Sequence, residues 1–448
     1  MEARGRTSSS PGTSRATPWG STRSSRPCGR RAWRSSPSGS SPPQRQPQVG
    51  KSQVLEDLRL AIGDCPLGGR VRGWDLIRQH RDLRLLFLSN FLWSFGAMLY
   101  TFVWPNYVRD LGGTEREIGL LSSLMFATVA VTLIPGGWLA DRWERKRLMV
   151  ATWGLAAFGP LLYALAGSWQ GLVPGVILYN IFVGWPAMEA YIADAVPPGA
   201  LSRAFTLTAS GFSLGAILSP LLGASLLPWV GMRGLFLISF VFFLLSTGVL
   251  ALMSSQRPTP RHMAEAAPTG HRRELVIWTA LFVVASWGSA ALRPFLAPYL
   301  EDALGLARPW ILASSALLAL GEVVLAPSLG QIGDRDGARA LARGLALVVA
   351  GGLLLFSGPW AIVPAMFLLG GDRVAASLFR ATIGRWAGAR RGLVFGGTLV
   401  LANTAQALGP LAGARLYALS PAGPLLLASG LAALTALLAW SLRNRASR

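Results

Sequence analysis

From Arg81 onward, long apolar stretches alternate with short polar connections. A stretch of about 18 or more apolar residues is long enough to cross the ~30 Å core of a bilayer as a helix. The pattern predicts twelve spans, at 83–108, 116–140, 147–167, 171–194, 203–229, 232–253, 275–299, 309–332, 338–357, 359–383, 391–417 and 421–442. The predicted fold is an all-α polytopic membrane protein with twelve transmembrane helices in two six-helix bundles.

A polar segment between the sixth and seventh spans divides the predicted bundles. The N-terminal bundle covers 81–254, the cytoplasmic central loop 255–274 and the C-terminal bundle 275–443. The Ser-, Pro- and Arg-rich tail 1–73 has too little apolar surface to fold, so we expect it to be disordered. An Arg-rich, acid-poor start is also typical of a transit peptide, and a start site placed too early gives the same pattern.

Composition and charge agree with a membrane protein. Only 14% of residues are charged, whereas soluble proteins average about 25%. The net charge of +21 lies in the tail and the loops, with no aromatic-interleaved basic domain, so no nucleic-acid partner is expected. Lys and Arg gather on one side of the predicted spans, which predicts that both termini are cytoplasmic. We expect the chain to lie in the plasma membrane. We expect a monomer in the lipid bilayer.

The second half of the chain repeats the first. A shift of 193 residues aligns Pro105 with Pro298, Gly112 with Gly305, Gly137 with Gly330, and Asp141 with Asp334. With a shift of 190, Pro220 and Gly223 align with Pro410 and Gly413. Many transporters are built from such repeats and hold their substrate where the repeats meet.

Two charged loops carry a family resemblance. The loop after the second span has Gly137, Asp141, Arg142, Lys146 and Arg147, and the loop after the eighth has Gly330, Asp334, Arg335, Gly337 and Arg339. Both resemble the G-x-x-x-D-[RK]-x-G-x-[RK]-[RK] motif of the major facilitator superfamily of secondary transporters, although Glu144 stands where glycine is usual. The resemblance implies alternating access and a small-molecule substrate, with no cofactor. It leaves open whether a proton gradient drives transport.

The fifth span carries a second, partial motif. Gly215, Ser219, Pro220, Gly223 and Ala224 are similar to the G-x-x-x-G-P-x-x-G-G of drug–proton antiporters in this family, with two substitutions. Proline bends a helix and small residues permit close helix approach, so ordinary packing explains the same residues.

The fourth span departs from another family pattern. Proton-coupled members carry an arginine there, and this chain has Asn180 before Gly184. The difference weakens the case for drug–proton antiport.

Ionisable residues inside the spans are the main site candidates, because a charge in the bilayer costs at least ~2.5 kcal/mol. They are Glu189, Arg293, Glu322, Asp372 and Arg373. In this family the first, fourth, seventh and tenth spans line a central cavity, which by resemblance makes all but Glu322 candidates to face it. Consecutive helical residues lie ~100° apart, so Asp372 and Arg373 are not expected to point straight inward together.

Each candidate has a functional and a structural interpretation. Asp372 is the first choice for a proton-binding carboxyl, since burial disfavours its charged form. Arg293 is the expected contact for an anionic substrate group, or it extends to the outer interface as a snorkelling side chain. Arg373 and Glu322 lie at similar depth, so they either serve the site or neutralise each other. Weaker candidates are Asn90, Asn180, Trp185, Trp287, Asn403 and Gln406.

Enzymatic and metal chemistry are not expected. Gly211, Ser213 and Gly215 match the G-x-S-x-G string of hydrolases, but they lie inside an apolar helix instead of a strand-turn-helix. All histidines and both cysteines lie outside the spans, so the sequence predicts no catalytic residues and no metal site.

The sequence therefore predicts an alternating-access transporter with proton coupling. Facilitated diffusion, and a receptor or lipid translocator on the same fold, remain alternatives. In the outward-open state, we expect Asp141 to meet the start of the eleventh span near Arg391, and Asp334 to meet the start of the fifth span near Arg203.

Overall fold

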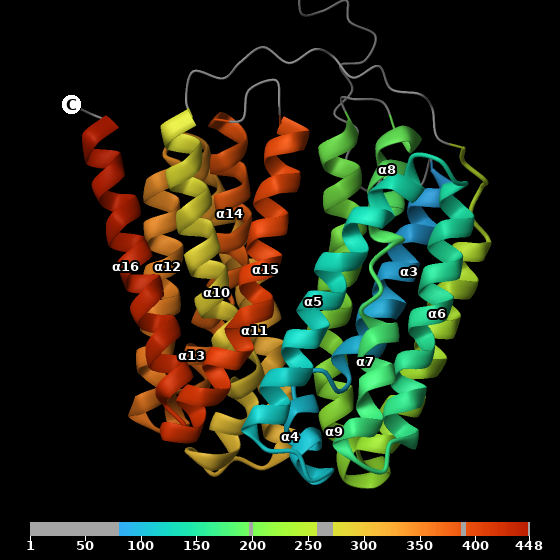
Figure 1. The fold of residues 1–448 in the computed structure, drawn as a ribbon, viewed down its shortest axis with the longest axis horizontal. Coiled ribbons are helices and arrows are strands. Elements are labelled where there is room, and N and C mark those ends of the chain that lie inside the picture. The colour runs from blue at the N-terminus through green and yellow to red at the C-terminus, as the bar shows by residue number, and fades with distance from the viewer. Residues whose placement is uncertain (1–79, 197–199, 258–271, 387–390, 447–448) are drawn as a thin grey trace, which may run out of the picture. The chain divides into compact units, whose positions relative to one another are not determined.

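The computed structural model describes residues 80–196, 200–257, 272–386 and 391–446, and every regular element within these ranges is helical. The tail 1–73 and most of the central loop lie outside the described residues. The α-helices (Figure 1) are α3 Arg81–Met98, α4 Trp104–Asp110, α5 Glu115–Ala140, α6 Arg145–Leu165, α7 Val173–Tyr179, α8 Trp185–Ala195, α9 Leu201–Ala251, α10 Arg272–Asp302, α11 Arg308–Arg335, α12 Gly337–Leu354, α13 Ile362–Leu369, α14 Gly371–Trp386, α15 Arg391–Leu419 and α16 Gly423–Ala446.

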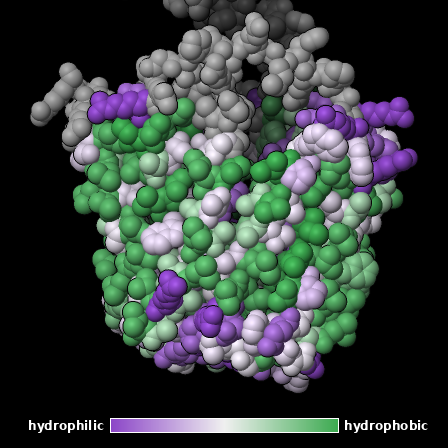
Figure 2. All heavy atoms as spheres, viewed as in Figure 1, coloured by the Kyte–Doolittle hydropathy of each residue, from purple (hydrophilic) through white to green (hydrophobic). Residues whose placement is uncertain are grey.

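The helices have the length and surface of a membrane protein. Eight helices in the described residues are long and apolar enough to cross a bilayer, and α9 alone covers two predicted spans. Figure 2 shows a broad band of hydrophobic side chains across the visible face, with hydrophilic side chains gathered towards its two ends. The predicted all-α polytopic fold is confirmed, while the count of twelve spans stays a prediction with which these helices are consistent.

The first and fourth predicted spans are broken, although the sequence analysis treated each as one continuous helix. α4 begins with Pro105 in its first turn, and α8 begins with Pro186 in its first turn. A proline lacks the N–H that would continue the preceding helix, and its ring clashes with the carbonyl four residues earlier. Each proline therefore starts a new helix after a break, and both breaks border the cavity described below.

The fifth and sixth predicted spans, 203–229 and 232–253, correspond to two helices that α9 Leu201–Ala251 contains, and these meet at Gly231, where the boundary between the spans was expected. Gly231, with a φ of 64°, is the non-helical residue at which α9 changes direction. This region of backbone space favours glycine, which has no Cβ to clash. The tenth predicted span is also divided, into α13 and α14, at Gly370.

The described helices pack into two groups (Figure 1), one formed by α3 to α9 and the other by α10 to α16. In the first group, α3 and α6 pack on α9, and α5 packs on α8. In the second group, α10 packs on α15 and α16, and α12 packs on α14 and α16. Between the groups, α5 packs on α15 and α9 packs on α11. The repeat makes these two contacts equivalent, because α5 corresponds to α11 and the first part of α9 corresponds to α15.

Small residues let helices within each group approach closely. A Cβ added at Gly223 would lie 2.6 Å from the Leu99 carbonyl oxygen, and one at Gly413 would lie 2.1 Å from the Ala291 carbonyl oxygen. Pro220 and Pro410 lie inside α9 and α15, three residues before these glycines. The partial motif and its repeat counterpart thus occupy equivalent packing contacts, as the structural interpretation of these residues requires.

Replacing Gly413 with alanine should destabilise the protein by about 1–3 kcal/mol, because the new methyl group forces α10 and α15 apart. The matched control is Gly397→Ala in the same helix, where no heavy atom lies within 4 Å of the added Cβ. Alanine should be neutral there, or stabilising by up to ~1 kcal/mol through its helix propensity. Thermal unfolding of both variants in one detergent tests this, and equal Tm values for the pair would contradict it.

Candidate functional site

A central cavity of about 500 Å³ lies between the two groups of helices. Its size falls within the range of ligand-binding cavities, roughly 300–1,000 Å³. The first group contributes the turn between α3 and α4, together with α5, α6 and α7, and the second contributes chiefly α10, α11, α14 and α15. The cavity therefore lies where the two repeats meet.

The wall from the first group is mainly aromatic and apolar. Its aromatic side chains are Tyr100, Phe102, Trp104, Phe126, Tyr163, Tyr179 and Phe182. The ring centroids of Tyr100 and Tyr163 are 6.1 Å apart, and those of Trp104 and Tyr163 are 5.9 Å apart. Tyr100, Trp104 and Tyr163 are almost fully buried, so the partly exposed Phe102, Phe126 and Phe182 offer the apolar area to a ligand.

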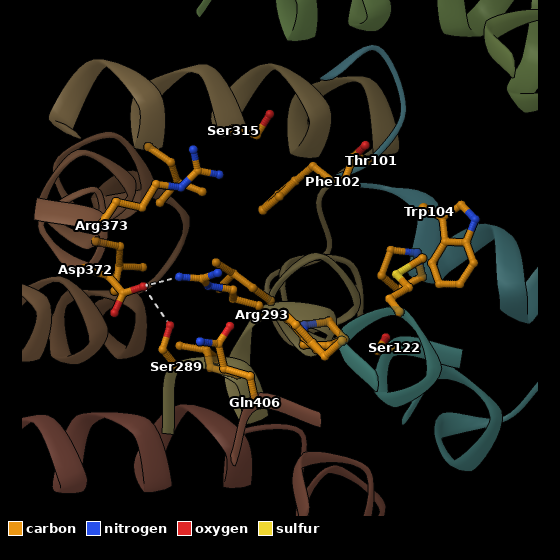
Figure 3. A pocket seen from close by; sticks show the side chains of 18 of the residues that line it. Thr101, Phe102, Trp104, Ser122, Ser289, Arg293, Ser315, Asp372, Arg373 and Gln406 are labelled. Atoms are coloured by element: carbon orange, nitrogen blue, oxygen red, sulfur yellow. Dashed lines mark hydrogen bonds and ion pairs between the residues drawn. The ribbon is translucent and has the colours of Figure 1, made fainter. Parts of the chain in front are cut away.

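The wall from the second group carries charge (Figure 3). Arg293 Nη2 donates to Asp372 Oδ2 at 2.8 Å, and Ser289 Oγ donates to the same oxygen at 2.6 Å. Ser289 and Arg293 lie four residues apart on α10 and so share one face of that helix. They hold the Asp372 carboxylate of α14 from the neighbouring helix.

A second ion pair lies beside the first. Arg373 Nη1 donates to Glu322 Oε2 at 3.3 Å, which joins α14 to α11. Asp372 and Arg373 both border the central cavity, yet one side chain pairs with α10 and the other with α11. Because adjacent residues of a helix point ~100° apart, Asp372 and Arg373 pair with two different neighbouring helices. We refer to Arg293, Asp372, Arg373 and Glu322 as the four-charge cluster.

The structure separates the remaining predicted site residues. Asn180 lines the central cavity and donates to the Val176 carbonyl oxygen at 2.8 Å, and Asn403 and Gln406 also line it. Glu189 does not line the central cavity and accepts a hydrogen bond from Trp185 at 3.0 Å. The break before α8 changes the register of that helix relative to α7, so a face assigned from an unbroken helix does not hold for Glu189. Asn90, Trp185 and Trp287 also lie outside the lining of the central cavity.

Sequence reasoning missed the aromatic wall and Ser289. Two signals were present: Tyr100, Phe102 and Trp104 form an aromatic run just before Pro105, and Ser289 precedes Arg293 by one helical turn. Arg293 itself borders the cavity and pairs with Asp372, so it is not the snorkelling side chain of the alternative interpretation.

A second cavity of about 310 Å³ is lined by all of the four-charge cluster and shares Arg293, Asp372 and Arg373 with the first. It follows α14 from Asp372 to Arg380, towards the helix end at Trp386. The sequence predicts this helix end to be cytoplasmic. The charged site is therefore continuous with space that leads to the predicted inner side.

At the end of the helices opposite to the predicted inner side, ion pairs join the two groups. Arg109 bonds to Asp302 at 2.9 Å and to Glu115 at 3.0 Å, and Arg308 bonds to Asp110 at 2.8 Å and to Glu301 at 3.0 Å. Each arginine thus binds one carboxylate of its own group and one of the other. Tyr417 also donates to Asp302, at 2.7 Å. We refer to Arg109, Asp110, Glu115, Glu301, Asp302 and Arg308 as the outer ion-pair cluster.

The repeat explains this arrangement. Arg109 and Asp302 are 193 residues apart, which is the repeat shift, and so are Glu115 and Arg308. Equivalent positions therefore carry opposite charges, and the symmetry of the repeats brings Arg109 and Asp302 together. Burial acts to lower the pKa of Arg109, but hydrogen bonds with Tyr417 and Asp302 raise it above the usual value for arginine. The guanidinium of Arg109 stays charged at any physiological pH.

The first motif loop follows the last residue of α5, whereas Glu115 of the outer ion-pair cluster is the first residue of that helix. Arg142 lies over the ring of Trp138, 4.2 Å from its centroid. Glu144, which departs from the family pattern, pairs with Arg147 at 2.7 Å across the start of α6. The departure thus gives the loop an internal ion pair.

The second motif loop joins α11 to α12 without an intervening turn. Gly330, Asp334 and Arg335 lie in α11, and Gly337 begins α12. The Asp336 side chain caps α12 by accepting from the backbone N–H of Arg339 at 3.0 Å. In the part of the chain that the structure describes, neither Asp141 nor Asp334 forms an ion pair, and both are exposed. The side chain of Arg391 lies outside the described residues.

Comparisons with known proteins agree on one fold. A family model described as Major Facilitator Superfamily matches residues 86–373. The multidrug resistance protein MdtG of Proteus mirabilis is 26% identical over 357 residues, covering 75% of this chain and 88% of the relative. MdtG of Salmonella arizonae is 28% identical over 318 residues, covering 66% and 78%.

Solved structures show the same fold at low identity. A crystal structure of a POT family transporter bound to a thioalcohol-conjugated peptide has a TM-score of 0.67 and 14% identity, covering 82% of this chain and 97% of that chain. The human organic anion transporter MFSD10 has a TM-score of 0.61 and 18% identity, covering 80% and 99%.

Proposed function

The chain belongs to the major facilitator superfamily of membrane transporters, and on this premise we propose that it moves a small organic solute by proton-coupled alternating access. It is a multi-pass transporter and not an enzyme, as its family and relatives establish. The observation that carries the proposal is the Arg293–Asp372 pair in a cavity between the two repeats. A carboxylate that lines this cavity is able to bind and release a proton, and a solute in the cavity is able to change its contacts.

Alternating access is supported by the difference between the two ends of the site. The outer ion-pair cluster joins the two groups on one side, while the second cavity continues from the four-charge cluster towards the other. This is the arrangement expected of an inward-open state. Opening the outer side requires the cross-group pairs of Arg109 and Arg308 to break.

The proposed inner gate consists of the two motif loops. Asp141 and Asp334 are exposed here, which fits a state in which the inner ends of the groups have moved apart. On outward opening, Asp141 would meet the start of α15 and Asp334 the start of α9. Helix N-termini attract carboxylates, with a contribution of typically 0.3–1 kcal/mol at exposed sites.

Proton coupling rests on Asp372 with Glu322 as its neighbour. Both carboxylates lie in helices with the composition of membrane spans, and both are held by arginines. Movement of either arginine towards a solute would leave a carboxylate without its counter-ion, and such a carboxylate binds a proton more readily. Coupling then follows from competition for the arginines.

Further features of the proposal follow from the sequence. We place the protein as a monomer in the plasma membrane with both termini inside, because the basic residues favour that side. The relatives are named for multidrug resistance, which supports organic compounds of drug size as solutes. The cavity of about 500 Å³ admits molecules of this size.

A two-step experiment tests the proposed function. Drugs and metabolites are first screened for their ability to raise the Tm of the purified protein, since binding to the folded state stabilises it. Each stabilising compound is then tested for flux in proteoliposomes, with and without an imposed pH gradient. We expect saturable flux that the gradient accelerates.

The other outcomes identify the alternatives. Flux that ignores the gradient would replace proton coupling with facilitated diffusion. Stabilising compounds that bind without flux or counterflow would make the protein a receptor on a transporter fold. Empty proteoliposomes, and proteoliposomes with heat-inactivated protein, serve as controls for leakage.

A further inference from the structure

We infer that the solute is an amphipathic organic anion and that it binds together with one proton. The inference rests on the proposed transport function and names the solute class of the same cavity. It follows from the four-charge cluster on one wall and the aromatic wall opposite it.

The four-charge cluster is formally neutral, but its positive groups are the more accessible ones. The side chains of Arg293 and Arg373 are 47% and 48% exposed, whereas their partners Asp372 and Glu322 are 28% and 32% exposed. The guanidinium of an arginine has five N–H donors. Among the described residues, Arg293 and Arg373 each use one such donor, in a single hydrogen bond.

The carboxylates are the less exposed partners, and one oxygen of each is held by an arginine. Oδ2 of Asp372 accepts from both Ser289 and Arg293. A cation approaching Asp372 meets the guanidinium of Arg293 at the same oxygen, so it is repelled where it should bind. An anion meets two guanidinium groups with unused donors, and guanidinium groups bind carboxylates and phosphates through two parallel hydrogen bonds.

The opposite wall specifies the remainder of the solute. Phe102, Phe126 and Phe182 line the same cavity and are partly exposed, so they present apolar surface to it. Aromatic side chains bury large areas and stack on other rings. A solute with an anionic head at the arginines and an aromatic or apolar body satisfies both walls.

Proton binding follows from the exchange of partners at Arg293. The anion takes over the hydrogen bond from Arg293, and Asp372 then takes up one proton, so the net charge of the loaded site equals that of the empty site. The charged groups around Asp372 are Arg293 from α10, Glu322 from α11, and Arg373 and Arg380 from α14, while α15 contributes the neutral Gln406. Anion and proton thus cross in the same direction, and an inward proton gradient drives uptake.

Three naphthalene probes of equal body and different charge test the solute class. They are 2-naphthoate (anion), 2-naphthylmethylammonium (cation) and 2-naphthylmethanol (neutral), each titrated into the purified full chain and monitored by thermal shift. We expect naphthoate to bind at least about tenfold more tightly than the other two. Its affinity should rise as pH falls from 8 to 6, by up to about tenfold per unit if one proton binds with each anion. Proton uptake on binding is measured in weakly buffered solution with a pH dye.

Two variants test whether the four-charge cluster causes the preference for naphthoate. Arg293→Gln should remove the preference for naphthoate and the proton uptake, whereas Arg343→Gln, an exposed arginine on α12 away from both cavities, should change neither. If Arg293→Gln does not fold, Arg373→Gln and the probe order of the unaltered protein carry the test.

Several results would overturn the inference. Tighter binding of the cation, equal binding of all three probes, or binding of none would overturn the solute class, and naphthoate binding without proton uptake would overturn the cotransport. These outcomes differ from a failure of the proposed function, in which the probe order holds but proteoliposomes show no flux.

Discussion

Asparagine at position 372 should abolish solute accumulation driven by a pH gradient. The side chain keeps nearly the shape of aspartate and is able to accept from Ser289 and Arg293, but it cannot take up a proton. With one proton per solute, a gradient of one pH unit supports at most about tenfold accumulation in the unaltered protein. In Asp372→Asn we expect the solute concentrations inside and outside to become equal, a ratio of about one. Accumulation is measured in proteoliposomes and divided by the rate of solute exchange at equal pH in the same preparation, which corrects for altered binding.

Glu189→Gln is the matched control for this prediction. Glu189 is also an acid in a predicted span, but it bonds to Trp185 on its own helix and lines neither of the two cavities that hold the charged residues. Its replacement should leave accumulation at the level of the unaltered protein. Accumulation that survives in Asp372→Asn would assign proton binding elsewhere, with Glu322 as the next carboxylate to replace.

Breaking the outer ion-pair cluster should shift the protein towards its outward-open state. Asp110→Asn and Asp302→Asn together remove the pairs by which Arg308 and Arg109 cross between the two groups. An exposed ion pair contributes about 0.2–1 kcal/mol, so the two together should change the outward-open population by roughly 2- to 30-fold. The effect should shrink at high salt, which screens exposed charges.

Cysteine labelling measures this shift. Cys28 and Cys65 are first replaced with serine, and Thr101, which lines the central cavity in the turn after α3, is replaced with cysteine as the reporter. A membrane-impermeant maleimide added outside intact cells should label the reporter faster in the double variant. Glu115→Gln is the control, because it removes a partner of Arg109 within the first group and no link between the groups. Equal labelling rates in the double variant and this control would rule out a gating role for the cross-group pairs.

The helices were predictable because the bilayer imposes a local rule. A segment inside hydrocarbon must satisfy its own backbone hydrogen bonds, so a long apolar run becomes a helix wherever it occurs. The predictions failed where a local signal was given too little weight. Pro105 and Pro186 break the first and fourth spans by removing an N–H, whereas Gly231 turns the chain at the boundary that was expected between the fifth and sixth spans.

The charged residues of the site were predictable for a similar reason, since each costs free energy in a membrane and therefore stands out in an apolar run. Their partners were not predictable in the same way. The Arg373–Glu322 pair was one of two alternatives, and the pairing of Arg293 with Asp372 was not foreseen although both residues were candidates. Partner choice depends on how α10, α11 and α14 are rotated against one another, which no single helix records.

The sequence by itself determined a polytopic helical protein, its internal repeat, and the few ionisable residues that its spans contain. These properties follow from hydropathy and spacing, which act locally along the chain. The tertiary structure decided which residues share a cavity, that Glu189 is not among them, and that opposite charges at repeat-equivalent positions meet in the outer ion-pair cluster. Such contacts join residues nearly 200 positions apart, so they arise from the packing of one repeat against the other.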